Sequence, residues 1–264
     1  MNTLFVFGSG SGGNALAIRH RGQTLLIDAG FSAREIQRRA ASAGLALTQV
    51  VGLVLTHEHG DHASGAPRLA RDLGIPVLAS EGTWSALRGK FSHAPFRPLA
   101  PMGEATVGAF RIQACATSHD AAQPIAIAVE AEGLRLGVAY DLGRPTAAVR
   151  WLLSGCTALV VEANHDEVML RTSDYPASVR ERISGSGGHL SNRAAAELLC
   201  EVQHPGLSTV VLAHLSARCN DAETARQAVE PTLRDRGYTG SLHVALQDRP
   251  LPPIELALPV APVG

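Results

Sequence analysis

The densest group of metal-binding residue types in this chain is the run Thr56-His57-Glu58-His59-Gly60-Asp61-His62, which directly follows the apolar stretch 51–55. An apolar stretch of this length predicts a buried strand, and a strand end delivers its loop to the surface of a fold. Imidazoles and carboxylates are typical ligands of zinc and similar cations. Without a cation, so many polar groups would crowd together unpaired, which costs stability. The run therefore predicts a metal site at a strand end.

The local geometry of this run indicates that it contributes to two ion sites. His57 and His59 alternate in an extended segment and are expected to face one ion. Asp61 and His62 lie at the turn into a helix that is expected to start near Ala63, and they are expected to face a neighbouring ion.

Short apolar strands alternate with turns and helices along the chain, which predicts a mixed α/β fold. A hairpin turn at Glu132 and Gly133 disfavours a purely parallel sheet, and two sheets covered by outer helices fit better. The expected strands are 3–7, 15–19, 24–28, 51–56, 76–79, 110–116, 125–131, 134–140, 159–162, 209–213 and one near Leu242. The expected helices are 33–43, one after His62, a short one after 79, others around Ser178 and Ala195, and 222–236.

No Pro- or Ser-rich linker and no charge run divides the middle of the 264 residues, so one domain covering 1–264 is expected. The Pro-rich end, 251–264, is expected to form a closing tail that packs irregularly or frays.

The composition restricts partners and location. The net charge of −1 argues against nucleic-acid binding through a bulk basic surface, so any such contact must be local. The 4 cysteines form no C-x-x-C pair, which fits a reducing compartment. The N-terminus lacks the features of a signal peptide, and no stretch is apolar enough to span a bilayer. A cytoplasmic protein without a membrane partner is expected.

The loop Gly8-Ser9-Gly10-Ser11-Gly12-Gly13 satisfies the dinucleotide fingerprint G-x-G-x-x-G, which requires a helix immediately after it. Here the alternating residues 14–19, a turn at Arg21-Gly22 and another strand predict a hairpin instead. A dinucleotide-binding protein is therefore disfavoured, and it would leave the histidines unexplained.

The run from His57 to His62 resembles the H-x-H-x-D-H signature of the metallo-β-lactamase superfamily. The resemblance implies a four-layer αββα sandwich, of class α/β (α+β), and two divalent metal ions, Zn²⁺ or Mn²⁺, with Fe also compatible. It implies further ligands at strand ends in the family's order, and it assigns one ion to His57, His59 and His119, the other to Asp61, His62 and His214, and both to Asp141. Penicillin-destroying members carry Cys at the position of that bridging Asp, which argues against antibiotic hydrolysis.

Two later segments are similar to the nucleic-acid-processing branch of the superfamily, which includes ribonuclease Z. They are Gly187-Gly188-His189-Leu190-Ser191 and the stretch 159–166. The resemblance implies that His189 lies by the scissile phosphate and donates a proton to the leaving oxygen, and that Glu162 orients it. The ordinary alternatives are a helix cap for His189 and a strand-end carboxylate for Glu162. His165 is expected at the surface and is not assigned to metal.

The Gly-Ser loop, the run Glu-Ala-Asn-His-Asp and the stretch 213–220 most resemble the YycJ- or WalJ-like branch, a group of exonuclease-type enzymes. The resemblance implies that substrate contacts come from Ser9, Ser11, Asn14, Asn164 and Ser216. For the loop, a flexible turn is the alternative. The sequence shows no inserted second domain or exosite arm, so it does not tell how such an enzyme would hold a long polymer.

The expected function is that of a dinuclear metal-dependent phosphodiesterase or exonuclease acting on DNA or RNA. A water activated by the metals would attack the phosphorus, and Asp61 would accept its proton. The alternative is hydrolysis of a small thioester, lactone or other small ester, which needs the metals but not Glu162 and His189. Nothing in the sequence selects DNA or RNA, the polarity of degradation or the oligomeric state.

Overall fold

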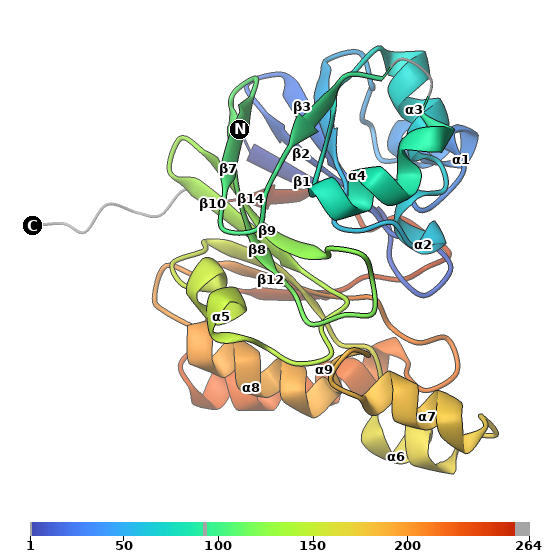
Figure 1. Cartoon of the computed structure of the whole chain (residues 1–264). Coiled ribbons are helices and arrows are strands. Elements are labelled where there is room, and N and C mark those ends of the chain that lie inside the picture. Colours follow the sequence, from blue (N-terminus) through green and yellow to red (C-terminus); the bar gives the residue numbers. More distant parts are fainter. Residues whose placement is uncertain (1, 92–93, 257–264) are drawn as a thin grey trace, which may run out of the picture.

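Two β-sheets pack face to face and carry helices on their outer sides (Figure 1). The structure is a computed structural model that describes residues 2–91 and 94–256. Each sheet contains seven strands in this part of the chain. The predicted αββα sandwich is confirmed.

The first sheet has the order β14-β1-β2-β3-β4-β5-β6. Its strands β1 to β3 are antiparallel, and β3 to β6 run parallel to one another. The bounds are Asn2–Gly8 (β1), Ala15–His20 (β2), Gln23–Ile27 (β3), Val50–Val54 (β4), Val77–Ala79 (β5), Phe96–Pro98 (β6) and Ile254–Leu256 (β14).

The second sheet has the order β13-β12-β11-β10-β9-β8-β7. Its strands β10 to β13 are parallel, and β11 and β12 are buried along their whole length because both faces are covered. The bounds are Glu104–Val107 (β7), Phe110–Ala116 (β8), Ile125–Ala131 (β9), Leu134–Ala139 (β10), Ala158–Glu162 (β11), Thr209–Ala213 (β12) and Ser241–Val244 (β13).

Three apolar clusters hold the four layers together. The central cluster joins the sheets, for example through Ile18 of β2 and Ile127 of β9. A second packs β1–β5 against α1 (Ala33–Ser42), α3 (Ala66–Leu73) and α4 (Glu81–Leu87). A third packs the other sheet against α5 (Ala147–Leu153), α8 (Asn192–Val202) and α9 (Ala222–Asp235). The shared central cluster agrees with a single domain, which stays a prediction.

The remaining short helices lie near the loops that follow the strands. They are α2 (Gly60–Ala63), the 3-10 helix Arg88–Lys90, α6 (Glu167–Thr172) and α7 (Ala177–Ser184). Figure 1 shows α6 and α7 as a pair that projects from the body of the sandwich. No helix in the described ranges is long and apolar enough to cross a membrane.

Both predicted hairpin turns are present. Arg21 and Gly22 have φ values of 48° and 81°, and Glu132 and Gly133 have 40° and 80°. Two consecutive residues with positive φ make the tight turn that matches the twist of antiparallel strands. The strand β2 that follows the Gly-rich loop excludes the helix that a dinucleotide site requires.

The structure corrects several expectations. Strands β6 and β7 and helices α5 and α6 were not anticipated, because these segments are short and partly exposed. The closing tail was expected to be irregular, but Ile254–Leu256 forms the edge strand β14 against β1. The pair Pro252-Pro253 stands before this strand, where no ladder hydrogen bond is lost. The rest of that tail, 257–264, lies outside the described residues.

Candidate metal centre

The histidine-rich segment leaves β4 in an extended form and then enters a helical turn. Helix α2 begins at Gly60, so Asp61 and His62 lie inside it and not before a helix at Ala63. The reason is that His59 takes the N-cap position and its carbonyl accepts the amides of His62 and Ala63. His57 and His59 thus project from extended backbone, and Asp61 and His62 from the helical turn.

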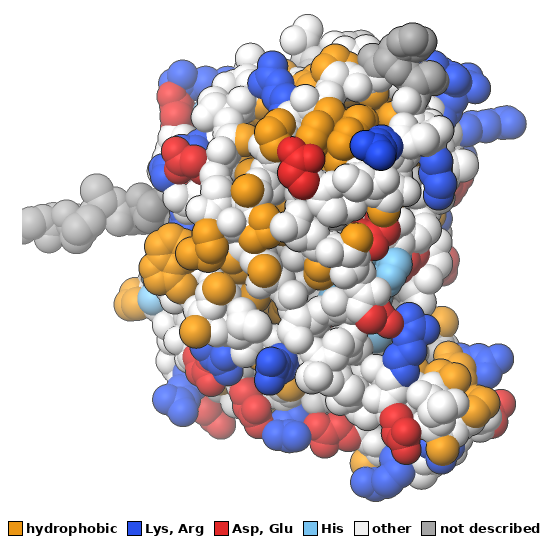
Figure 2. Space-filling view, in the orientation of Figure 1, with side chains coloured by type: hydrophobic (Ala, Val, Ile, Leu, Met, Phe, Trp, Pro, Cys, Tyr) orange, Lys and Arg blue, Asp and Glu red, His pale blue; other side chains and the backbone are white. Residues whose placement is uncertain are grey.

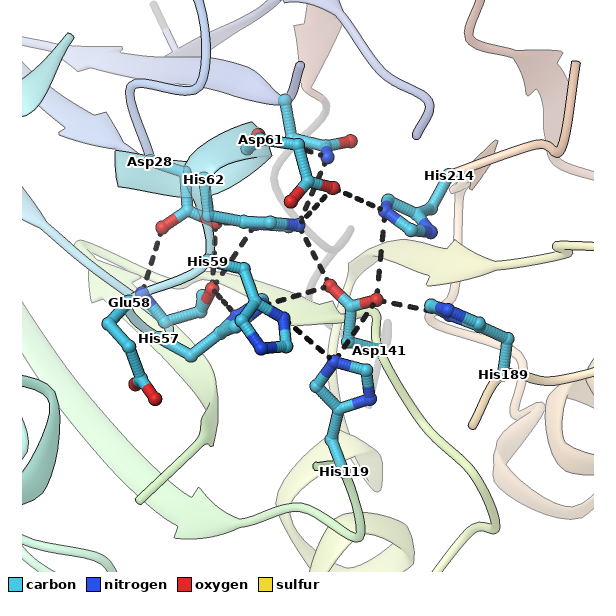
Figure 3. A network of polar contacts seen from close by, with 12 residues as sticks. Asp28, His57, Glu58, His59, Asp61, His62, His119, Asp141, His189 and His214 are labelled. Carbon is cyan, nitrogen blue, oxygen red and sulfur yellow. Dashed lines mark hydrogen bonds and ion pairs between the residues drawn. The ribbon is translucent and has the colours of Figure 1, made fainter. Parts of the chain in front are cut away.

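The side chains implied as ligands converge on one small volume between the two sheets (Figure 3). Within each of the following groups, one possible ligand atom per residue lies within 4.8 Å of the others: His57, His59 and His119; Asp61, His62 and His214; His57, His62 and Asp141. The first two groups are those that the resemblance implied, and Asp141 lies between them. A fourth group of the same kind, Asp141, Glu162, His189 and His214, was not implied as a metal site. The ligand roles themselves stay predictions.

The separations between donor atoms suit a shared cation. Nδ1 of His59 lies 3.2 Å from Nε2 of His119, and Oδ2 of Asp61 lies 3.2 Å from Nε2 of His214. Two ligand atoms on a tetrahedral zinc ion, at about 2.0–2.1 Å each, would lie about 3.3 Å apart. In addition, Nε2 of His57 is buried without a hydrogen-bond partner in the described residues. The residues present therefore fit divalent metal.

Electrostatics favour metal-binding protonation states at Asp141 and His57, whereas the carboxylates around His62 and His214 outweigh burial and raise the pKa of both rings. Burial alone would raise the pKa of Asp141, but His214 and His62 hold that pKa well below its usual range. Burial and the neighbouring His62 hold the pKa of His57 well below its usual range. A carboxylate and a neutral imidazole are the forms that coordinate metal.

Hydrogen bonds from residues around the ligands fix the orientation of the rings, and the main one was not predicted from the sequence. Asp28, which follows β3, accepts from Nδ1 of His62 at 2.7 Å and from the amide and hydroxyl of Thr56 at 2.8 Å each. The hydroxyl of Thr56 lies 3.1 Å from Nδ1 of His57. Such partners orient a ligating histidine and raise its basicity. The available signal was a lone strand-end Asp before Ala29-Gly30, which is weak by itself.

Three residues that follow strands hold the left-handed backbone conformation. The φ values of Asp28, Asp141 and His214 are 57°, 55° and 57°. This conformation is uncommon for residues other than glycine and is found where function demands it. It turns each chain sharply after β3, β10 and β12 and aims the side chain into the cluster.

His189 and Glu162 form the pair that the resemblance implied. Nδ1 of His189 lies 2.7 Å from Oε1 of Glu162 and 3.1 Å from Oδ1 of Asp141. Oε2 of Glu162 accepts the backbone amides of Leu142 and Leu190, so this fully buried carboxylate is fixed. Burial alone would lower the pKa of His189, but Glu162 and Asp141 outweigh it and raise that pKa to about 10.

The residues expected to contact substrate are mostly buried. Ser9 and Asn14 bond to each other, and Ser9 also accepts the amide of His214. Asn164 donates to the carbonyl of His214, and Ser216 accepts the amide of Cys219. Of the five, Ser11 alone is exposed. These contacts support a positioning role for the four buried residues, and substrate contact stays a prediction.

His165 differs from its expected place. Its side chain is not at the surface, because only 2% of the residue is exposed. The chain folds it inward since residue 165 forms a parallel bridge with Ser191 and its carbonyl accepts the amide of Asn192.

Comparison with known proteins agrees with this geometry. The profile of the family described as a β-lactamase superfamily domain matches residues 23–215, which include every residue implied as a metal ligand. The chain belongs to the metallo-β-lactamase superfamily. Divalent metal binding follows from this membership. That the donor cluster holds the metal stays a prediction.

Relatives within the superfamily cover most of the chain. Exodeoxyribonuclease YycJ of Bacillus anthracis is 34% identical, over 88% of this chain and 89% of the relative. Exodeoxyribonuclease WalJ of Streptococcus pneumoniae serotype 2 is 29% identical over 85% of each chain. The metallo-β-lactamase fold protein YhfI of Bacillus subtilis superposes with a TM-score of 0.73 at 15% identity, over 95% of this chain and 99% of that one. The likeness to YhfI shows the shared fold.

Proposed function

We propose that this chain is a dinuclear metal-dependent exonuclease that hydrolyses the phosphodiester bonds of DNA. The observation that carries the proposal is the His189–Glu162 pair beside the donor cluster, in a chain that is 34% identical to an exodeoxyribonuclease over most of both lengths. A hydrolase of small thioesters or lactones would need the donor cluster but not this pair.

The chain's own residues would divide the work. His57, His59 and His119 would hold one ion, Asp61, His62 and His214 the other, and Asp141 both, with Zn²⁺ or Mn²⁺ as the ions. Bound ions would lower the pKa of a coordinated water and neutralise charge on the scissile phosphate. The side chain of Asp61 is 23% exposed and that of Asp141 is 3% exposed, so Asp61 is the carboxylate placed to accept a proton from water.

His189 would act on the leaving group. Its Nδ1 faces Glu162, so its Nε2 is free to donate a proton to the departing sugar oxygen. Burial alone would lower the pKa of His189, but Glu162 raises it and so favours the protonated ring. The side chain is 23% exposed, so substrate can reach it. Figure 2 shows that some of the histidine atoms of the molecule reach the surface.

Degradation of DNA with a free end tests the proposal. The chain, supplied with Mn²⁺ or Zn²⁺, is incubated with end-labelled linear DNA, circular single-stranded DNA, RNA of the same sequence, and a small thioester and lactone. We expect release of mononucleotides from linear DNA, no cleavage of the circle, and complete loss of activity with chelator. Cleavage of the thioester or lactone alone would establish the alternative function.

The proton donor is tested with one variant and a matched control. His189→Ala should lower kcat on DNA by about 10²- to 10⁴-fold, the usual contribution of a general acid, while the metal content is unchanged. His243→Ala removes a histidine of β13 that contacts only Ser241 by hydrogen bonding among the described residues, and should act like the parent protein. Equal activity of His189→Ala and His243→Ala would refute the proposed role of His189 as the general acid.

A further inference from the structure

A cavity of 260 Å³ lies between α6 and α7, and nothing described so far occupies it. Its walls include His165, Leu170, Arg171, Ala177, Arg180 and Glu181. The volume is slightly below the usual range for small-molecule sites, so the cavity would hold one small part of a larger ligand.

The cavity shares its walls with the elements that build the metal centre. His165 stands three residues after Glu162, on the loop that also carries Asn164 to its contacts with His214. Ser184, at the end of α7, also lines the cavity, and the loop after it leads to His189. On the same helix Arg182 contacts Asp120, beside His119, at 2.7 Å. A DNA strand that passes the metal centre would therefore run close to the cavity.

His165 is a buried polar side chain without a partner. Its Nδ1 is inaccessible to solvent and unbonded in the described residues, and no other contact there engages the ring by hydrogen bonding or ion pairing. Burial lowers the pKa of His165, so the ring is neutral and can both donate and accept a hydrogen bond. Because Nδ1 is closed to solvent, a ligand in the cavity would contact another part of the ring, which lines the cavity wall.

The side chains around the cavity favour an anion that is attached to a sugar or base. Arg171 makes no ion pair or side-chain hydrogen bond within the described residues, and Arg180 uses only its Nη1, on the carbonyls of Ser173 and Tyr175. The carboxylate of Glu167, which also lines the cavity, is engaged by Arg193. Two guanidinium groups thus face one unengaged carboxylate, Glu181. Guanidinium groups bind phosphate well, and the apolar Leu170 and Ala177 suit a sugar or base.

We propose that this cavity binds one nucleotide of a DNA strand whose scissile phosphodiester lies at the metal centre, with Arg171 and Arg180 at its phosphate and His165 against its nucleoside. The proposal rests on the proposed function. It gives the chain a local means of holding a polymer despite its net charge of −1. In Figures 1 and 2 the α6–α7 pair forms a lobe that carries basic side chains.

Two substrates separate strand binding from catalysis. One is linear DNA, and the other is bis(p-nitrophenyl) phosphate, a phosphodiester that has no neighbouring nucleotide. The variants are Arg171→Ala and His165→Phe, because Arg180 is tied to the backbone between α6 and α7 and its loss would disturb the cavity itself. Arg88→Ala is the matched control, since Arg88 is exposed and its side chain makes no hydrogen bond or ion pair in the described part of the chain.

We expect Arg171→Ala and His165→Phe to raise KM for DNA about tenfold, with kcat/KM for bis(p-nitrophenyl) phosphate unchanged. Arg171→Ala should also reduce the slope of log(kcat/KM) for DNA against log[salt] by about 0.7–0.9, the loss of one phosphate contact. Equal losses on both substrates, or DNA kinetics like those of Arg88→Ala, would overturn the cavity's role while DNA hydrolysis by the parent chain stands. A parent chain that cleaves only the small diester would instead refute the proposed function.

Discussion

Nδ1 of His62 lies 2.7 Å from Oδ2 of Asp28, and neither side chain is exposed to solvent. The contact fixes the ring so that Nε2 faces Asp141 at 2.8 Å and Asp61 at 3.4 Å. Asp28 is thus a positioning residue that acts on the metal centre through His62.

Replacing Asp28 should weaken metal binding. We expect Asp28→Asn to lower the affinity for Zn²⁺ by about 10- to 100-fold, the usual effect of losing such a partner. The reason is that the neutral amide lacks the negative charge that the carboxylate places beside the His62 ring. Competition with a chromophoric chelator measures the affinity. Asp72→Asn, which alters a carboxylate paired with Arg68 on the surface, is the control. An affinity within twofold of the parent value would contradict the assignment.

The pH dependence of activity should reveal the effect of Glu162 on His189. A general acid must be protonated, so activity falls as the pH rises through the pKa of that acid. Glu162 raises the pKa of His189, which extends activity to higher pH. Glu162→Gln removes this charge and should move the basic limb of the kcat profile to lower pH. The profile is measured with DNA over about pH 6–10. A basic limb that stays at the same pH in Glu162→Gln would show that His189 does not determine this limb.

Two glycines near the metal centre should respond differently to replacement by alanine. A Cβ on Gly30 would lie 1.7 Å from the carbonyl oxygen of Asp61, so Gly30→Ala must displace the segment that carries Asp61 and His62. A Cβ on Gly60 would meet no heavy atom within 4 Å. We expect Gly30→Ala to lose bound metal and melt at a lower temperature, and Gly60→Ala to match the parent protein. Elemental analysis and thermal denaturation measure both, and full metal content in Gly30→Ala would count against the geometry.

The part of the site that sequence could reveal is the part encoded locally. His57, His59, Asp61 and His62 stand within six positions, so their spacing alone predicts a shared site. The placing of His119, Asp141 and His214 depended on family order. A sharp turn after the strand brings Asp141 and His214 to the cluster, and the left-handed backbone of these two residues has no clear signature in single residues.

The missed features depend on tertiary contacts. Asp28 is a single carboxylate whose importance arises from its pairing with a histidine 34 positions away. The edge strand at Ile254–Leu256 follows two prolines, and it forms because β1 offers an unpaired edge. The expected exposure of His165 was wrong because a bridge to Ser191 pulls its loop inward.

Metal content and DNA hydrolysis, measured on the same samples of the parent chain and Asp141→Asn, test the dinuclear centre most directly. Asp141 lies between the two donor groups, so its loss should affect both ions. If the two ion sites were independent of each other, the variant would lose only one ion. We expect two divalent ions per chain and chelator-sensitive DNA hydrolysis in the parent. Asp141→Asn should lose both the ions and the hydrolysis, while circular dichroism shows that its fold persists. One ion or none in an active parent chain, or unchanged hydrolysis by Asp141→Asn, would contradict the dinuclear assignment.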